Sequence, residues 1–535
     1  MSQSRQANDA VTAGRGFLLI TSAKLYFILV SAFLALGLPR LLGDPGLFGR
    51  YRTINAFVSI LNMVMIVGTI QSVSKLVSED ERRASHVKQI ALRVQAYIGG
   101  ALALAIVIFA EAIANFLFRD SSLAIYLRVG AVVTFFYSIY AVYVGLLNGS
   151  KQFARQAALD ALFSTLKVGL IVALVVAGYG VLGAFSGFAV AAAIITLTST
   201  WTVPRKLPSG NATIVPKQLT ALLVPILATT FFINLMVQLD VLILKGFVVS
   251  SVDAYLETNE GHERIAWLMA PLASPAESLT TLELAQEAAD RLAGLFGGAK
   301  NLALLPYQLT FAITFVVFPL VSNATYSNDQ KRAQQTVRQS MRFALLVAVA
   351  AGVVLISVGQ DALGILLGSQ YVAATPALNF LLLTTVCVAL TVLGLTILNS
   401  AGMEKQAFVI SLVIVVLYVV VLWLLLPTAT DLREGILTRT AQASLLTMIA
   451  GMSFVFALLH RRFGPPCSVL TLLRTGSAAV AVIGLMQFWL AGALAMLILK
   501  ALSSIILFAL VLFVTRELDN NDLDSVRRIL GSKSQ

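Results

Sequence analysis

The sequence predicts an all-α integral membrane protein with about 14 transmembrane helices, arranged as two parallel six-helix lobes around a central cavity plus two C-terminal helices. Three observations predict this fold. Apolar residues make up 58% of the 535 residues and charged residues only 12%, where a soluble domain carries roughly 25%. The apolar residues gather in runs of about 20, the length of a membrane span. Two short motifs also recur along the chain with nearly the same offset.

The composition excludes soluble enzymes, disordered proteins and nucleic-acid-binding proteins, because so few charges cannot cover the surface of a chain in water. The net charge of +12 is then best explained by cationic cytoplasmic loops. Two cysteines, Cys387 and Cys467, and three histidines in polar connections offer neither a disulfide framework nor a metal cluster. We therefore expect no cofactor and no enzymatic activity.

The spans follow one another along the whole chain. The first is too long for a signal peptide and has no small-residue cleavage site after it, which predicts an uncleaved anchor. In order, the expected spans are 16–39, 53–74, 94–117, 125–147, 157–178, 181–201, 219–245, 298–321, 341–359, 377–398, 408–426, 441–459, 473–490 and 494–515.

The loops predict the orientation of these spans. The two termini and the alternate loops that share their side hold 24 Lys and Arg residues, and the opposite loops hold about ten. Both termini are therefore expected in the cytoplasm, as an even number of spans requires. The longest loop, 250–293, then lies outside. It is acidic, and its part Thr280–Leu295 has helical periodicity, which we interpret as a solvated cap.

An internal repeat predicts the two-lobe architecture. Gly46-Leu47-Phe48-Gly49 recurs as Gly294-Leu295-Phe296-Gly297, and the turn at Asn148 recurs at Asn399. Six spans separate the copies, so both lobes have the same orientation in the membrane, as in alternating-access transporters. The expected domains are an N-terminal lobe (1–210), a C-terminal lobe (211–460) with the periplasmic insertion 250–293, helices 13 and 14 (461–515) and a cytoplasmic tail (516–535).

With these motifs the chain resembles the multidrug/oligosaccharidyl-lipid/polysaccharide (MOP) exporter superfamily, particularly its bacterial polysaccharide (O-antigen-type) flippase branch. The resemblance covers nearly the whole length except Ser250–Asp290. It implies a proton- or sodium-linked transporter that moves an undecaprenyl-pyrophosphate-linked oligosaccharide to the periplasmic leaflet of the bacterial inner membrane. The residues that carry it are Gly43, Gly46–Gly49, Gly149, Asn234, Gln238–Asp240, Pro319, Leu367–Tyr371, Gly402 and the C-terminal segments 519–523 and 526–530.

Cationic residues near or within the spans are candidate ligands for a pyrophosphate group. Lys24 lies in span 1, Lys300 begins span 8, and Arg50 and Arg52 precede span 2. Fixed positive charges in a cavity of low dielectric attract a dianion strongly. In the related lipid II flippases an arginine stands at the place of Lys300. The alternative is that the lysines snorkel to an interface and the arginines sit at a helix end.

Two acidic residues within the spans are candidates for ion coupling. In span 5, Asp160, Ser164 and Lys167 form a polar stripe, with Lys167 a further candidate for the cationic cavity. A structural lock between Asp160 and Lys167 is the alternative. Asp240 in span 7 can carry a proton or bind a cation, or it pairs with Lys245. Related lipid II flippases use polar groups of span 11 in a sodium site, and span 11 here has no acid or amide, which favours protons.

Tyr137, Tyr140 and Tyr143 recur every three residues in span 4. Their rings can stack on sugars, although an interfacial belt or ordinary packing is favoured.

Three other functions stay open beside the flippase. A drug/cation antiporter of the same superfamily is expected to have an acidic cavity, whereas the candidates here are mostly basic. A polysaccharide polymerase or glycosyltransferase would use the loop 250–293, but the internal repeat has no role in such an enzyme. A scaffold would not need buried charges.

The expected partners are the lipid-linked oligosaccharide, H⁺ or Na⁺, the lipid bilayer and a polysaccharide polymerase or chain-length regulator, with no nucleic acid. No phosphate-binding motif for ATP occurs.

Overall fold

The computed structural model describes residues 26–27, 29–203, 208, 216–256, 280–310, 317, 321, 325, 329–428, 435–489 and 491–517. All regular structure among them is helical. The chain forms two compact units, Met1–Gly297 and Gly298–Gln535. The first boundary expected from the repeat lies near residue 210, so these units are not the two expected lobes, which stay a prediction.

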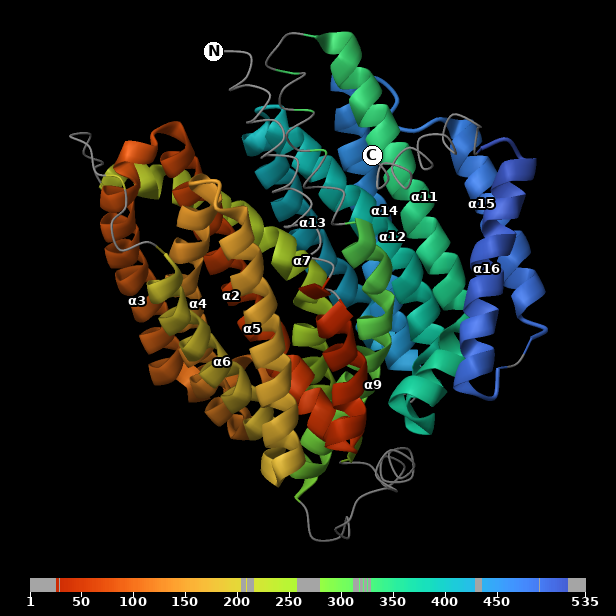
Figure 1. Cartoon of the computed structure of the whole chain (residues 1–535). Coiled ribbons are helices and arrows are strands. Elements are labelled where there is room, and N and C mark those ends of the chain that lie inside the picture. The colour runs from red at the N-terminus through yellow and green to blue at the C-terminus, as the bar shows by residue number, and fades with distance from the viewer. Residues whose placement is uncertain are drawn as a thin grey trace. The chain divides into compact units, whose positions relative to one another are not determined.

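The first unit is a bundle of long helices in which α2 packs against α4 and α7, and α5 packs against α6 (Figure 1). A shorter apolar helix, Leu29–Leu42, precedes α2. The helices are α2 (Pro45–Glu79), α3 (Ala84–Phe118), α4 (Ala124–Gly149), α5 (Phe153–Leu174), α6 (Gly180–Thr202), α7 (Pro216–Leu256) and the larger part of α9 (Thr281–Ala303).

The second unit contains the remaining helices, with α12 between α11 and α14, and with α15 and α16 packed on α11. The C-terminal pair is fastened to α11 by two ionic contacts. Lys500 Nζ of α16 lies 2.9 Å from Asp361 Oδ2, and Arg342 Nε lies 3.0 Å from Glu517 Oε1. The helices are α11 (Gln330–Ala362), α12 (Thr375–Ser400), α13 (Glu404–Leu425), α14 (Gly435–Phe463), α15 (Val469–Met486) and α16 (Leu494–Val514).

The helices agree with the expected spans. Within the described residues, 11 helical segments are long and apolar enough to cross a membrane. One of them, Phe153–Thr202, reverses direction at Gly178, whose φ is +93°. A Cβ on Gly187 would lie 2.7 Å from the backbone of Leu170, so α5 and α6 form a hairpin and account for two spans. The first and eighth expected spans lie partly outside the described residues.

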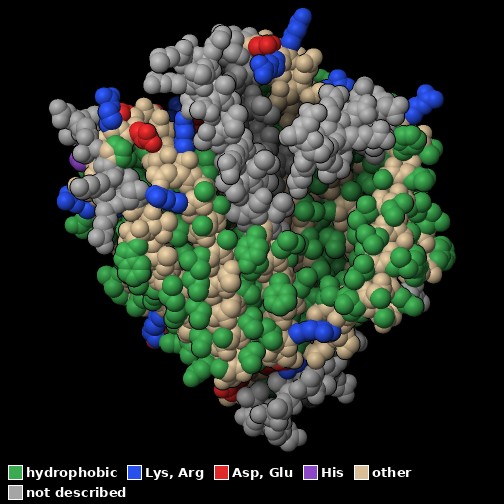
Figure 2. All heavy atoms as spheres, viewed as in Figure 1, with side chains coloured by type: hydrophobic (Ala, Val, Ile, Leu, Met, Phe, Trp, Pro, Cys, Tyr) green, Lys and Arg blue, Asp and Glu red, His purple; other side chains and the backbone are tan. Residues whose placement is uncertain are grey.

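Hydrophobic side chains cover the middle of the helices on the visible face, and Lys and Arg lie near the helix ends (Figure 2). Phe116 and Trp423, for example, are 86% and 75% exposed. Such exposure of large apolar side chains is expected where the solvent is lipid. The chain is a multi-pass membrane protein.

The helix bounds confirm the internal repeat. Helix α4 and helix α12 have 26 residues each, and α5 and α13 have 22 each. In both pairs the first and last residues differ by the offset of the Asn148 and Asn399 turns. Three residues connect the two helices in each half, and tight turns there are made possible by a left-handed residue, Lys151 in one and Gly402 in the other.

The structure of the loop 250–293 differs in part from the solvated cap that the sequence predicts. Helix α7 continues to Leu256, and α9 begins at Thr281. From Leu284 to Gly297 the helix is largely buried: Ala288, Leu292 and even Asp290 are 0% exposed. The periodicity was that of a helix, as expected, but its apolar face lies in the core of the first unit. Residues 257–279, with most of the acidic part, lie outside the described residues.

Candidate functional site: an ion network at the crossing of α2 and α9

The two copies of the Gly-Leu-Phe-Gly motif contact each other inside the first unit. A Cβ on Gly49 of α2 would lie 1.7 Å from the carbonyl oxygen of Asp290 in α9. A Cβ on Gly294 would lie 1.9 Å from the carbonyl oxygen of Pro45. Only glycine permits such an approach of two helix backbones, as in small-residue crossings of membrane helices. The motif therefore does more than form turns: it allows α2 and α9 to cross in direct backbone contact.

A buried lysine lies beside this crossing. Lys245 of α7 is 0% exposed, and its Nζ donates to Asp290 Oδ1 at 2.5 Å and to Asp120 Oδ2 at 2.7 Å. Asp120 lies in the connection between α3 and α4, where its Oδ1 also accepts from the Ser122 amide and hydroxyl. One ammonium thus joins three segments that are far apart in the sequence.

The second oxygen of Asp290 extends the contacts to α2. Arg50 Nε donates to Asp290 Oδ2, and Arg50 Nη2 donates to Glu287 Oε2, both at 2.9 Å. Glu287 Oε1 in turn lies 3.2 Å from Arg291 Nε, and Arg291 Nη2 lies 2.9 Å from Asp44 Oδ1. Asp44 also caps the N-terminus of α2 through the Leu47 amide.

We call these seven residues the ion network: Asp44, Arg50, Asp120, Lys245, Glu287, Asp290 and Arg291. Four carboxylates meet three cations, which leaves one excess negative charge in a largely buried place. Burial raises the pKa of Asp290, although Lys245 and Arg50 oppose this effect. Burial acts in the same direction on Asp120, but Lys245 and Ser122 outweigh it and hold the pKa of Asp120 below its ordinary value. Asp290 is the better proton acceptor of the two.

The expected cationic residues lie in different surroundings. Arg50 belongs to the ion network. Arg52 is 4% exposed, donates to Gln238 Oε1 at 3.1 Å and interacts electrostatically with Asp240, while its Nε has no hydrogen-bond partner. Lys300, near the end of α9, is 5% exposed. Lys24 lies outside the described residues. Whether these groups bind an anion together stays a prediction.

Asp240 is 2% exposed on α7, and its Oδ1 accepts a hydrogen bond from the Val241 amide at 2.8 Å. Lys245, considered above as its structural partner, is bound instead by Asp120 and Asp290. Five residues along a helix place two side chains on different faces, which explains the difference. The carboxylate of Asp240 has Arg52 as its neighbouring cation.

The polar stripe of α5 faces an aromatic cluster. Tyr140 donates to Asp160 Oδ1 at 3.1 Å, and Lys167 Nζ lies 4.2 Å from the ring centroid of Phe188 in α6. Each charged residue therefore has a partner on another helix. Tyr137 and Tyr140 are 7% and 4% exposed and pack with Phe163 and Phe188. This burial agrees with packing, the interpretation favoured above for the tyrosines.

Most of the ion network was not anticipated from the sequence. Asp44, Asp120, Glu287 and Asp290 were assigned no role, and Arg50 was expected to bind substrate. One signal was available: Asp44 and Asp290 each stand close before a copy of the glycine motif, where a helix pair in backbone contact would bring flanking charges together.

The comparisons with known proteins agree on one fold. A family model described as "Polysaccharide biosynthesis protein" matches residues 13–325. The solved structure of the lipid II flippase MurJ in an inward closed conformation superposes with a TM-score of 0.67, at 13% identity, over 94% of this chain and 99% of that chain. An inward-facing multidrug resistance MATE family transporter gives a TM-score of 0.56, at 12% identity, over 83% of this chain and 94% of that chain.

A MOP superfamily transporter from Pyrococcus furiosus gives a TM-score of 0.53, at 13% identity, over 83% of this chain and 95% of that chain. At such identities the likeness shows the fold alone. Comparison of the sequence with curated proteins returned no match.

Proposed function

This chain belongs to the polysaccharide biosynthesis protein family, and we propose that it is a flippase of the MOP superfamily for lipid-linked oligosaccharides. Its substrate would be an undecaprenyl-pyrophosphate-linked oligosaccharide, carried to the periplasmic leaflet of the bacterial inner membrane by alternating access. Both termini would lie in the cytoplasm, and an ion gradient, with H⁺ as the favoured ion, would reset the cycle. A polysaccharide polymerase or chain-length regulator would receive the product.

The ion network at the α2–α9 crossing is the observation that supports this proposal most directly. A transporter needs a closure that is specific when shut and yet opens within its working cycle. Buried ion pairs suit this need, because the desolvation of the charges offsets much of their attraction and opening returns them to water. The glycine contact makes the closure tight, and the charges make it reversible.

The same network offers a way to link opening to an anionic substrate. Arg50 is held by Glu287 and Asp290 while α2 and α9 are in contact. When the helices separate, Arg50 would lose these partners and could bind the pyrophosphate. With Arg52, Lys24, Lys300 and Lys167, it would form the cationic cavity that a dianion needs. Binding of substrate and closure of the crossing would then compete for one guanidinium.

Asp240 and Asp160 are the proposed ion-coupling residues, and Asp290 joins them as a third candidate. A carboxylate that takes up a proton in one conformation and releases it in another couples transport to the proton gradient. In Asp290, protonation would reduce the excess negative charge of the ion network. In Asp240, it would leave Arg52 without its neighbouring carboxylate.

A multidrug/cation antiporter is the alternative within the same fold, since MATE transporters share it. This alternative needs an acidic cavity. The buried acids Asp240 and Asp290 would supply it in a conformation that separates them from their cations. A membrane polysaccharide polymerase is disfavoured by the parallel repeat, which has no role in polymerisation.

The test is a translocation assay with the purified protein in liposomes that contain a fluorescent undecaprenyl-pyrophosphate oligosaccharide. We expect label to reach the opposite leaflet faster with an imposed pH gradient than without it. The double variant Lys24→Ala/Lys300→Ala is expected to stop transport while the protein stays folded, and Lys331→Ala, which changes an exposed lysine of α11, serves as the matched control. Wild-type rates in the double variant would refute the cationic cavity.

Replacement of the coupling acids separates the three candidates. The variants are Asp240→Asn, Asp160→Asn and Asp290→Asn. We expect the rate to lose its dependence on the pH gradient in the variant whose replaced acid carries the coupling proton. Translocation of a fluorescent cation in place of the lipid-linked sugar would support the antiporter instead.

A further inference from the structure

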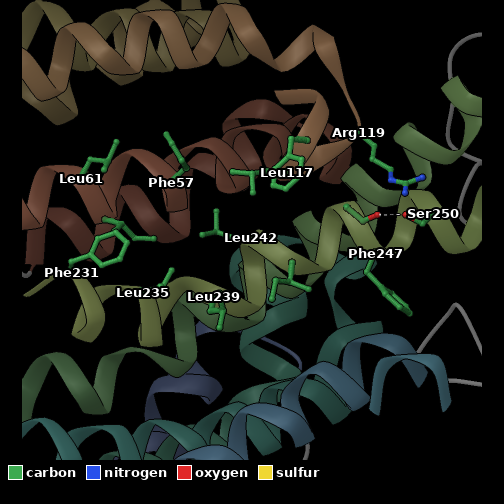
Figure 3. Close-up of a pocket in the computed structure, with 14 residues that line it drawn as sticks. Phe57, Leu61, Leu117, Arg119, Phe231, Leu235, Leu239, Leu242, Phe247 and Ser250 are labelled. Atoms are coloured by element: carbon green, nitrogen blue, oxygen red, sulfur yellow. Dashed lines mark hydrogen bonds between the residues drawn. The ribbon is translucent and has the colours of Figure 1, made fainter. Parts of the chain in front are cut away.

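An apolar groove runs along the first unit between α2, α3 and α7 (Figure 3). Its volume is about 480 Å³. Phe57 and Leu61 of α2 line it together with Phe231 and Leu235 of α7. Such a volume lies within the range of roughly 300–1,000 Å³ that is typical of sites for small molecules and cofactors.

Arg119 lies at one end of the groove, beside Ser250. It is the charged residue of the lining, its side chain is exposed, and it makes no ion pair within the described part of the chain. The backbone of Arg119 is fixed in a left-handed conformation with φ +51°: its amide donates to the Asn115 carbonyl, and its carbonyl accepts from Gln286 Nε2 at 2.8 Å. The Ser250 hydroxyl is already bonded to the Gly246 carbonyl.

A groove that is apolar along its length and positively charged at one end fits an amphiphile with an anionic head. The guanidinium is the side chain that best matches the oxygens of a phosphate group. The apolar walls exclude a sugar chain, because its hydroxyl groups would lose their hydrogen bonds to water without replacement. These properties fit the tail and phosphate of a lipid.

The length of the groove distinguishes between kinds of lipid. Its lining on α7 extends from Phe231 to Ser250, a helix length of about 28 Å at 1.5 Å per residue. The hydrocarbon core of a bilayer is about 30 Å thick, so the acyl chains of a phospholipid in one leaflet reach only about 15 Å. A chain that follows the whole groove must be much longer than a phospholipid tail, as a polyprenyl chain is.

We propose that the groove between α2, α3 and α7 binds the tail of a long-chain polyprenyl phosphate, with Arg119 on the phosphate. This inference rests on the proposed function and adds to it a place for the lipid part of the substrate. On the orientation expected from the loop charges, the end of α3 faces the periplasm. The groove would then hold the lipid on the side to which the sugar is delivered.

The groove also adjoins the ion network. Arg119 precedes Asp120, and Gly246 follows Lys245, so the lining and the network share two elements. A lipid held by Arg119 would place its phosphate near the closed α2–α9 crossing. The groove can thus retain the lipid while the crossing closes behind the transported group.

The test measures binding of undecaprenyl phosphate, without any sugar, to the full-length protein in nanodiscs of neutral phospholipid. We expect saturable binding by the wild type. Arg119→Gln should weaken it at least about tenfold, the loss expected for a hydrogen bond to a charged group. Leu235→Trp, which fills the groove, should abolish it. The matched controls are Arg155→Gln, at another exposed arginine, and Leu473→Trp, on the lipid-facing surface of α15.

Unchanged binding in both folded groove variants would overturn the proposal. Equal competition by an anionic phospholipid with ordinary acyl chains would also overturn it, because the groove would then be a general phospholipid site. Arg119→Lys keeps the charge and should recover part of the affinity, whereas a purely structural role of Arg119 predicts no recovery.

Translocation is measured separately, so the two proposals can fail independently. Groove-dependent binding without transport of the glycolipid would refute the flippase and support the groove. Transport by the wild type with unchanged binding in the groove variants would support the flippase and refute the groove.

Discussion

Helices α5 and α13 occupy equivalent places in the two halves of the repeat, yet their interiors differ. They have the same length, and a turn of three residues precedes each. Asp160 and Lys167 of α5 correspond to Ser411 and Tyr418 of α13. Lys167 lies over the ring of Phe188, whereas the Tyr418 hydroxyl is hydrogen-bonded to Ser444. The repeat has kept the backbone, while charges in the helix interior occur only in α5.

The same contrast appears in the ion pairs. The first unit contains the seven-membered ion network with an excess carboxylate, and the described part of the second unit contains simpler contacts such as Lys500–Asp361. A balanced pair suffices to hold helices together. An unbalanced network responds to protons and to competing anions. The described part of the first unit therefore holds the group of buried charges that can respond to protons and anions.

The largest expected effect comes from removing the central cation of the ion network. Lys245→Met should destabilise the protein by about 3–5 kcal/mol, because two buried carboxylates lose their common partner. Lys500→Met should have a smaller effect, since it leaves one carboxylate, Asp361, that is partly accessible to solvent. Thermal unfolding in detergent measures both. Equal losses would remove the distinction between the two ionic sites.

The glycine crossing is the next test. Gly294→Ala should cost at least roughly 1–3 kcal/mol, because the new Cβ meets the Pro45 carbonyl, which belongs to a helix backbone and cannot move alone. Gly394→Ala in the second unit is the control: its Cβ would meet a Val455 methyl group at 2.3 Å, which a rotamer change can relieve. The melting temperature should fall clearly more for Gly294→Ala, and the reverse order would contradict the close crossing.

Exchanging the polar stripe tests whether its charges serve transport. The double variant Asp160→Ser/Lys167→Tyr gives α5 the residues of α13. We expect it to fold and to transport the glycolipid at least about tenfold more slowly, which corresponds to about 1.4 kcal/mol in the barrier. The translocation assay in liposomes measures the rate. A wild-type rate would show that the charges of α5 are structural.

The smallest expected effect concerns pH. Because the pKa of Asp290 is raised, its contribution to stability is complete below its ordinary value of 3.8 and is lost as the pH rises through the higher folded-state value. Asp290→Asn should therefore match the wild type near pH 4 and exceed it increasingly toward neutral pH. Melting temperatures across this range measure the difference.

Asp120 provides a control of opposite sign. Its pKa is lowered, so its contribution is present above 3.8 and is lost as the pH falls through the lower folded-state value. Asp120→Asn should be less stable than the wild type at neutral pH. The same pH profile in the two variants would contradict the assignment of Asp290 as the proton acceptor.

The sequence predicted the backbone of this protein better than its site. Apolar runs and repeat offsets depend on local composition, so the spans and the equality of the two halves could be derived from them. The ion network joins Asp44, Asp120, Lys245 and Asp290, which only the packing of four elements brings together. The pairing of Asp240 with Lys245 was suggested by nearness in sequence, but their positions on the helix place them on different faces.

The burial of α9 shows a second limit. The periodicity of Leu284, Ala288 and Leu292 indicates one apolar face without saying what covers it. Gly294, four residues after Asp290, held that information, because a glycine in a helix interior has a cost that a close neighbouring backbone can justify. Its match to Gly46 was used to identify the repeat, and the contact between the two copies followed only from the structure.

The two ionic contacts of the second unit have a practical consequence for measuring movement. Lys500, near the start of α16, and Glu517, after its end, both bind residues of α11. We therefore expect α11, α15 and α16 to move as one rigid body. The surface of α16 exposes residues such as Ile506, 65% accessible, that have no role in the proposed site. A spin label or fluorophore placed there would report movement of α11 during turnover without disturbing the residues proposed to bind the substrate.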